Sequence, residues 1–312
     1  MQQSGRQAWN YRVFGVDVES QIRLTSNQSE QSEFKHSAVT SSQILQGKVV
    51  MPQPEVAVQI AAFCWGNKNE VWLDIPNVAK FYLTAQQVIV EQAADCESDL
   101  LQVYLQGYAL GIQAMLARKL VLHATTLCIN DKAIVLCGSS GSGKSTLAAA
   151  LVSRGFTLVS DEVTILDQNG LVQPGFDDIK LWQDAAEVLA LPAQQTQPIR
   201  SAINKFYYRP QLQVAAPVRP AVVYVLGTDN RIPAELTEVT GFAKFEPLRS
   251  QYYRPFLVKP LQLDTLYLQL SGKFLGALPL VRVLRDMQHL SAERLSLLAD
   301  LVMQDAGARS VR

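Results

Sequence analysis

Gly138-Ser-Ser-Gly-Ser-Gly-Lys144-Ser145-Thr146 is the stretch of this 312-residue chain that decides its fold. The apolar run 133–137 precedes it and the run 147–151 follows it, so the order strand, glycine loop, helix is predicted. Glycines allow the backbone angles that turn successive N–H groups toward phosphate oxygens, and the following helix adds the positive end of its dipole. The spacing G-x-x-x-x-G-K-S therefore predicts a P-loop that binds a nucleoside triphosphate.

Two side chains of this loop have predicted roles of their own. The Lys144 amine is expected to bridge the outer phosphates as a flexible point charge, and the Ser145 hydroxyl to take one place in the octahedral shell of Mg²⁺. A glycine-serine turn before an ordinary helix is the alternative, disfavoured because strand and helix are both predicted where the motif requires them. The predicted nucleotide-binding residues are Gly138, Ser139, Ser140, Gly141, Ser142, Gly143, Lys144, Ser145 and Thr146.

Two adjacent acids, Asp161 and Glu162, interrupt an apolar strand predicted over residues 156–166. In P-loop enzymes an acid at the end of a neighbouring strand holds Mg²⁺ or accepts a proton from the attacking hydroxyl. Side chains alternate along a strand, so only one of the two can point at the phosphates in a regular segment, and Asp161 is favoured. The alternative is a solvated turn that carries both acids.

Composition and charge exclude several functional classes. Lys plus Arg and Asp plus Glu number 28 each, so no excess of positive charge favours nucleic acid or an anionic membrane as partner. The four cysteines are scattered without a C-x-x-C pair, which indicates buried, reduced thiols. The N-terminus is polar and no run of about eighteen apolar residues is present, so no membrane span is expected and the cytoplasm is the expected location.

The organisation of the chain changes near residue 98. Residues 1–98 have mainly β character and are predicted to form an N-terminal domain, while 99–312 form the P-loop domain. A helix is predicted from Ser98 to Lys119. Two apolar runs flank Asn130-Asp-Lys132 and predict a hairpin, hence a mixed rather than an all-parallel sheet. The fold class is α/β. The strands expected in the first domain cover 11–18, 71–75, 80–84 and 87–91.

The segments 122–124, 138–145 and 158–163 resemble the C-terminal catalytic domain of HPr serine kinase/phosphorylase. In that family a histidine precedes the P-loop by one strand hairpin, and an Asp-Asp pair follows at the end of the next strand. His123 and Asp161 stand at the matching positions here. The resemblance covers about 120–166 and implies an HPr-kinase/PEP-carboxykinase-like core with a mixed sheet.

The resemblance also implies roles for individual residues. Asp161 corresponds to the general base on the acceptor serine, Glu162 to the second acid, His123 to the histidine near the phosphates, and Ser145 to a Mg²⁺ ligand alongside the two acids. General chemistry agrees, because a serine hydroxyl is a poor nucleophile and a positioned carboxylate can take its proton. Apart from the resemblance, a lone histidine on an apolar strand is more often structural. Lys144 completes this catalytic set.

The sequence departs from the family after residue 166. A Glu-x-Arg-Gly segment is missing, and 175–182 occupies its place, so Asp177 or Asp178 is a candidate substitute and a surface turn is the alternative. The loop rich in Pro, Gly and Arg that accompanies phosphorolysis is missing too, so a one-way kinase is expected.

A basic stretch over 203–209 follows a polar, proline-containing loop expected from Ala193 to Arg200. It is predicted to be a lid that delivers Lys205 or Arg209 to the transferring phosphate, with an exposed strand as the equal alternative. Arg249 and Arg254 are weaker candidates of the same kind.

Together these observations predict a kinase that uses ATP and Mg²⁺ to phosphorylate a serine of a peptide or small protein. The chain resembles HPr-kinase-related proteins, some encoded with ribosomally made peptides such as lasso peptides, whose members phosphorylate a precursor peptide. The β-rich first domain is a candidate for acceptor recognition, and by the resemblance a homo-oligomer is expected. Two alternatives stay open: a kinase for a small molecule such as free serine, and a non-catalytic nucleotide-sensing or peptide-binding module.

Overall fold

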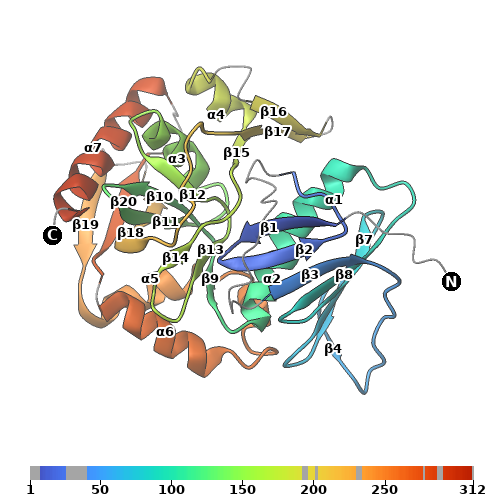
Figure 1. Cartoon of the computed structure of the whole chain (residues 1–312). Helices are drawn as coiled ribbons and strands as arrows, with labels where there is room; N and C mark the ends of the chain where they lie inside the picture. The colour runs from blue at the N-terminus through green and yellow to red at the C-terminus, as the bar shows by residue number, and fades with distance from the viewer. Residues whose placement is uncertain are drawn as a thin grey trace. The chain divides into compact units, whose positions relative to one another are not determined.

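The computed structural model of the chain describes residues 8–25, 41–191, 196–200, 203–229, 234–276, 278–286 and 291–310. The chain divides into two compact units (Figure 1). The first comprises Met1–Lys119 and Phe256–Thr265, and the second comprises Leu120–Pro255 and Leu266–Arg312. Helices and mixed sheets occur together, as predicted for the α/β class. No helix within the described ranges is both long and apolar enough to span a bilayer.

The first unit is built on an eight-stranded sheet with the order β1-β2-β3-β8-β7-β6-β5-β4. Pairing is antiparallel except where β3 meets β2 and β8. The strand expected over 11–18 is a hairpin instead, because Phe14 and Gly15 adopt positive φ angles that reverse the chain. The strands are β1 (Trp9–Val13), β2 (Val16–Ser20), β3 (Ser41–Gln46), β4 (Val58–Ala61), β5 (Cys64–Gly66), β6 (Val71–Ile75), β7 (Ala79–Leu83) and β8 (Gln87–Gln92).

The predicted helix after residue 98 is present but belongs to the first unit. It consists of α1 (Ser98–Tyr104), one π-helical turn (Leu105–Ala109) and α2 (Leu110–Leu116). The Gln113 side-chain amide donates to Ser42 Oγ at 2.9 Å, and the Lys119 amine donates to the Phe14 carbonyl at 3.0 Å. These contacts hold the helix to the first sheet, so the unit extends to Lys119, beyond the boundary expected at residue 98.

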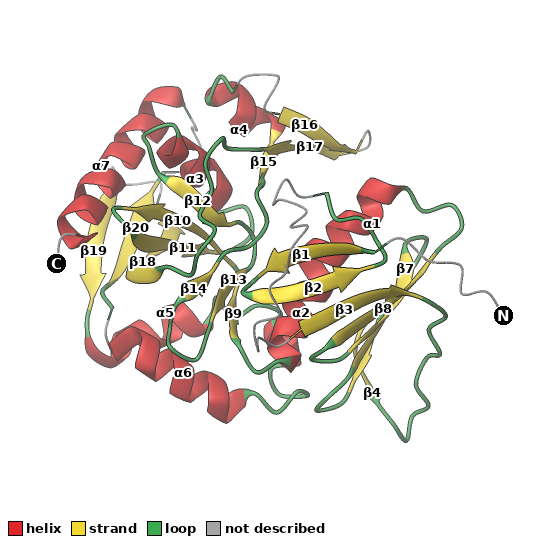
Figure 2. Ribbon diagram, viewed as in Figure 1, coloured by secondary structure: helices red, strands yellow, loops and turns green. Residues whose placement is uncertain are grey.

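The second unit contains a six-stranded mixed sheet with the order β12-β10-β11-β18-β20-β19 (Figure 2). The predicted antiparallel hairpin is present between β10 and β11, and β11, β18 and β20 run parallel to one another. The strands are β10 (Ala124–Ile129), β11 (Lys132–Gly138), β12 (Thr157–Ser160), β18 (Arg219–Thr228), β19 (Glu235–Val239) and β20 (Leu280–Arg285).

Helices α3 (Lys144–Val152) and α7 (Ala292–Ser310) pack against one face of this sheet. Apolar side chains from α3, α7 and the strands form one buried cluster, in which Leu147 and Leu151 lie with Ile134, Leu136 and Leu298. The small side chains of 148–150 are fully buried, so α3 lies close to the strands. This packing fixes the start of α3 directly beyond the end of β11 (Figure 1).

Two three-stranded sheets complete the second unit, with the orders β14-β13-β9 and β15-β17-β16. Of the loop expected from Ala193 to Arg200, Thr196–Arg200 is strand β16, because its backbone pairs with β17, and 192–195 lie outside the described residues. The remaining elements are β9 (Leu120–Leu122), β13 (Thr164–Leu166), β14 (Val172–Gln173), β15 (Ile179–Trp182), β16 (Thr196–Arg200), β17 (Ile203–Tyr208), α4 (Gln183–Val188), α5 (Phe245–Arg249), α6 (Asp264–Gly276) and the short 3₁₀ turns Gly241–Lys244 and Pro255–Leu257.

Candidate active site

The glycine loop joins β11 to α3 in the order predicted. Gly138 has a φ of 151°, and a Cβ atom there would lie 2.4 Å from Ser142 Oγ and 3.0 Å from the Leu226 carbonyl. Gly143, immediately before α3, has a left-handed φ of 76°. Only glycine fits the first position and glycine is strongly preferred at the second. The sequence therefore dictates a tight loop whose end is the N-terminus of a helix, which is an arrangement suited to anions.

Two buried polar side chains hold this loop from outside the motif. Gln251 accepts a hydrogen bond at Oε1 from the Gly138 N–H at 2.8 Å. Arg285, at the end of β20, donates to the Ser142 carbonyl and, at 3.2 Å, to the Gly227 carbonyl. Burial lowers the pKa of Arg285 to about 10, so its guanidinium stays charged at neutral pH behind the loop. Sequence reasoning missed both residues, although the position of Arg285 directly after an apolar strand was a usable signal.

The Lys144 amine lies beneath the loop. It donates to the Gly138 carbonyl at 2.8 Å and to the Ser139 carbonyl at 3.1 Å. Burial lowers the pKa of Lys144, and the charge of Asp161 opposes that shift. The Lys144 amine is thus already at the loop, close to where the motif requires it. A bound phosphate would attract it away from these carbonyls.

Asp161 connects the loop to two other segments, β10 and β15. Its Oδ1 atom accepts hydrogen bonds from Thr125 Oγ1 at 2.5 Å and from Ser145 Oγ at 3.1 Å. Its Oδ2 atom accepts a hydrogen bond from the Lys180 backbone N–H at 3.0 Å. The structure thus places Asp161 beside Ser145 of the glycine loop. Thr125 was not predicted, because its pairing with Asp161 depends on the strand register.

Two predicted strands divide at this site. The run 120–129 forms β9 and β10 with His123 between them, and the run 156–166 forms β12 and β13 with 161–163 between them. β10 pairs with β12, whereas β9 pairs with β13 in a different sheet. His123 and the two acids therefore lie opposite one another at the point where two sheets separate. A hydrophobic pattern alone does not reveal this break.

Glu162 turns away from Ser145 toward Lys180. Its φ of 67° breaks the strand, and its Oε2 atom lies 2.6 Å from the Lys180 amine. Burial by itself would raise the pKa of Glu162, but the charge and hydrogen bond of Lys180, aided by His123 and Arg254, lower it. Burial likewise opposes ionisation of Lys180, but Glu162 raises its pKa overall. The pair is charged at neutral pH.

His123 is held by backbone contacts. Its N–H donates to the Gln251 carbonyl at 2.8 Å, and its Nδ1 atom lies 3.1 Å from the Glu162 carbonyl oxygen. Burial, followed by the charge of Lys144, lowers the pKa of His123. The imidazole is therefore neutral at pH 7, and Nδ1 carries the proton if it bonds the carbonyl.

The segment 175–182, expected as either a substitute acid or a surface turn, is buried at both of its acids. Asp177 and Asp178 are 2% and 5% exposed and precede β15, so the surface-turn alternative is wrong. Burial raises the pKa of Asp178 to about 7, with Lys180 opposing the shift and Asp177 adding to it.

The basic residues predicted for a lid lie at several places. Lys205 is on strand β17, and its amine lies 4.5 Å from the ring centre of Trp182. Arg209 follows β17 and contributes to the electrostatics of Asp178. The segment is thus a strand, as in the alternative interpretation, but Tyr207 and Tyr208 on it are buried, so it is not the exposed strand expected there. Arg249 pairs with Glu246 at 3.6 Å in an exposed position, and Arg254 lies over the Tyr253 ring.

The oxygen donors present fit Mg²⁺ better than a softer metal. Ser145 Oγ and the Asp161 carboxylate are adjacent, and Mg²⁺ typically takes one or two carboxylates together with phosphate oxygens and water. The Glu162 carboxylate is paired instead with the Lys180 amine. Within the described residues, no group of three or more His, Cys, Asp or Glu side chains is arranged for a metal.

Comparison with known proteins gives one local match in sequence. No protein-family model matches the chain. Over 96 residues it is 34% identical to HPr kinase/phosphorylase of Nitrosomonas europaea, which is 31% of this chain and 28% of that protein. The solved HPr(Ser) kinase/phosphatase of Coxiella burnetii aligns with a TM-score of 0.32 at 14% identity, over 62% of this chain and 99% of that one. The chain is similar to HPr kinase/phosphorylase over the 96 matched residues, and it spans less than a third of the length of that relative.

Proposed function

We propose that this protein is a kinase that transfers the γ-phosphoryl group of ATP to a serine hydroxyl of a peptide or small protein. The observation that carries the proposal is the position of Asp161, whose carboxylate lies 3.1 Å from the P-loop hydroxyl of Ser145 and is held by the Lys180 N–H. A nucleotide-sensing module would not need a fixed carboxylate beside its phosphate loop. The local identity to HPr kinase/phosphorylase supports the same class.

In this proposal the glycine loop, Lys144 and the start of α3 bind the phosphates. Ser145 and Asp161 would hold Mg²⁺, which would supply positive charge that screens the phosphate oxygens. Asp161 takes the proton of the acceptor serine as the serine oxygen bonds to the γ-phosphorus. The bond from that phosphorus to the bridging oxygen of ADP breaks in the same transfer. His123, neutral and partly buried, contacts the Glu162 backbone carbonyl beside the site.

Further parts of the proposal concern the setting of the site. The core of the second unit is HPr-kinase/PEP-carboxykinase-like, and the first unit recognises the acceptor. The four free cysteines support a reducing compartment, the cytoplasm. We propose a homo-oligomer on the resemblance to HPr kinases alone.

Phosphorylation of a serine acceptor tests the proposal. The protein is incubated with ATP, Mg²⁺ and serine-containing peptides, HPr or free serine, and the products are weighed by mass spectrometry. Asp161→Asn should lower the rate about 10²–10⁴-fold, the usual contribution of a general base. Asp131→Asn is the matched control, because Asp131 is exposed in the β10–β11 turn at a φ of 56° that asparagine tolerates.

The outcomes separate the alternatives. A phosphoryl group on free serine alone indicates a small-molecule kinase. Tight ATP binding with no modified acceptor of any kind contradicts the proposal and indicates the sensing module. Equal rates in Asp161→Asn and wild type exclude Asp161 as the base.

A further inference from the structure

The small sheet β15-β17-β16 has one face against the buried cluster around α3. On its opposite face Trp182 is exposed, Lys180 and Lys205 are partly buried, and Tyr207 is buried. On β15, Ile179 and Leu181 join the buried cluster around α3, so Lys180 and Trp182 point to the opposite side. The register pairs Trp182 with Lys205 and Lys180 with Tyr207. We call the side formed by these four residues the outer face.

The outer face begins at the candidate base. The Lys180 N–H donates to Asp161 Oδ2 at 3.0 Å, and Trp182 follows two residues later along the same strand. A strand rises about 3.3 Å per residue, so Trp182 lies roughly 7 Å along the strand from the group that holds Asp161. An acceptor chain laid along β15 in an extended conformation advances by the same distance over two residues.

The two lysines of the outer face differ in whether a carboxylate neutralises their charge. Lys180 is neutralised by Glu162 at 2.6 Å. Lys205 has no carboxylate partner among the described residues, and its amine lies over the Trp182 ring at 4.5 Å. Trp182 is 51% exposed, so part of its ring is open to a ligand. An exposed aromatic ring with an uncompensated ammonium beside it suits a side chain with an apolar stem and a carboxylate end.

We propose that the outer face binds the acceptor as an extended peptide and selects an acidic residue two positions from the serine that is phosphorylated. The proposal rests on the proposed kinase function and specifies its substrate class. With the serine at Asp161, the side chain two positions away lies level with Trp182 and Lys205. Its carboxylate pairs with the Lys205 amine, and its methylene groups pack on the Trp182 ring.

Short peptides with one central serine test the proposal. Glu, Ala or Lys is placed two positions before or two positions after the serine, and kcat/KM is measured for each peptide. Wild type should prefer Glu over Lys by about tenfold at one of the two positions, because an exposed charge pair changes from attraction to repulsion. Lys205→Glu should prefer Lys at that position, and Trp182→Ala should lower kcat/KM for the Glu peptide with kcat little changed.

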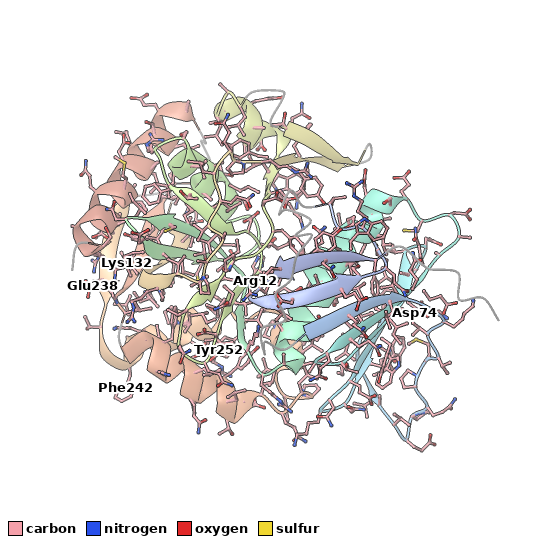
Figure 3. The ribbon with its side chains drawn as sticks, in the orientation of Figure 1. Arg12, Asp74, Lys132, Glu238, Phe242 and Tyr252 are labelled. Carbon is pink, nitrogen blue, oxygen red and sulfur yellow. The ribbon has the colours of Figure 1, made fainter. Side chains whose placement is uncertain are left out.

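Lys132→Glu is the matched control. Lys132 starts β11, at the opposite end of that strand from the P-loop (Figure 3). Lys132→Glu should leave the preference for Glu over Lys in the acceptor peptide unchanged. The ATP dissociation constant of Lys205→Glu and of the milder Lys205→Gln, measured by calorimetry, should equal that of wild type, which shows that the variants are folded.

The two proposals fail in different ways. Phosphorylation without a preference at either position, or the same preference in wild type and Lys205→Glu, overturns the acidic-acceptor proposal and leaves the kinase intact. If wild type phosphorylates no serine in any acceptor, the kinase function fails and the acceptor proposal fails with it.

Discussion

Replacing Lys180 with Met tests how the second acid of the site is stabilised. The Lys180 amine lies 2.6 Å from Glu162 Oε2, and the two side chains are 17% and 35% exposed. Exposed ion pairs contribute about 0.2–1 kcal/mol, whereas removing one partner of a fully buried pair costs about 3–5 kcal/mol. Because this pair is only partly withdrawn from water, the free energy of unfolding at pH 7 should fall by about 2 kcal/mol.

The pH dependence separates this electrostatic cost from a loss of packing. In wild type the pKa of Glu162 is below its ordinary value of 4.5, because Lys180 outweighs burial. A carboxyl with a lowered folded pKa contributes stability above its unfolded pKa, and the contribution is lost as the pH falls through the folded value. Without Lys180, burial raises the pKa of Glu162 instead. The difference between Lys180→Met and wild type should therefore shrink as the pH falls to about 4.

Urea titrations at the two pH values measure this difference, with Glu162→Gln and the double variant completing a double-mutant cycle. The double variant has no uncompensated carboxylate, so it should regain at least about half of the stability lost in Lys180→Met. An equal cost at both pH values, with no recovery in the double variant, refutes the reasoning and assigns the loss to the lysine stem.

Two further variants test the loop and the buried acid. Arg285→Met removes two charge-assisted hydrogen bonds to backbone carbonyls and should weaken ATP binding about 10–100-fold. AMP binding should weaken less, and Arg285→Lys should recover part of the ATP affinity. Equal losses of ATP and AMP affinity in calorimetry contradict a role at the outer phosphates. Asp178 has a folded pKa of about 7 against an ordinary 3.8, so the unfolded chain ionises first and wild-type stability falls as the pH rises between these values, by up to about 4 kcal/mol. The side chain of Asp178→Asn does not titrate, so the stability of this variant relative to wild type, measured by urea titration, should increase over that pH range. Parallel curves of stability against pH for the two proteins exclude a raised pKa of Asp178.

The local elements of the second unit could be predicted from the sequence because local patterns determine them. The glycine spacing, the β10–β11 hairpin and the start of α3 depend on backbone angles and periodicity within about twenty residues. The site contacts depend on longer distances along the chain. Gln251 reaches Gly138, and Arg285 reaches Ser142, across more than a hundred residues. No periodicity encodes such pairs.

The strand breaks at His123 and Glu162 show a second limit. Both fall inside apolar runs that read as single strands, but the two halves of each run pair in different sheets. The helix after residue 98 shows a third limit. Its apolar stripe predicts that one side of the helix is buried, but it does not predict which sheet packs against that side. The tertiary pairing decided both cases.

The segment Phe256–Thr265 makes the first unit discontinuous, since it belongs to that unit while its flanks belong to the second. Arg118 donates to the Leu261 carbonyl at 2.8 Å, and Leu257, Leu261 and Leu263 are fully buried. A fragment ending at Lys119 would therefore lack part of its own core. Recombination between genes that exchanges only the N-terminal segment would separate the first unit from this part of its core.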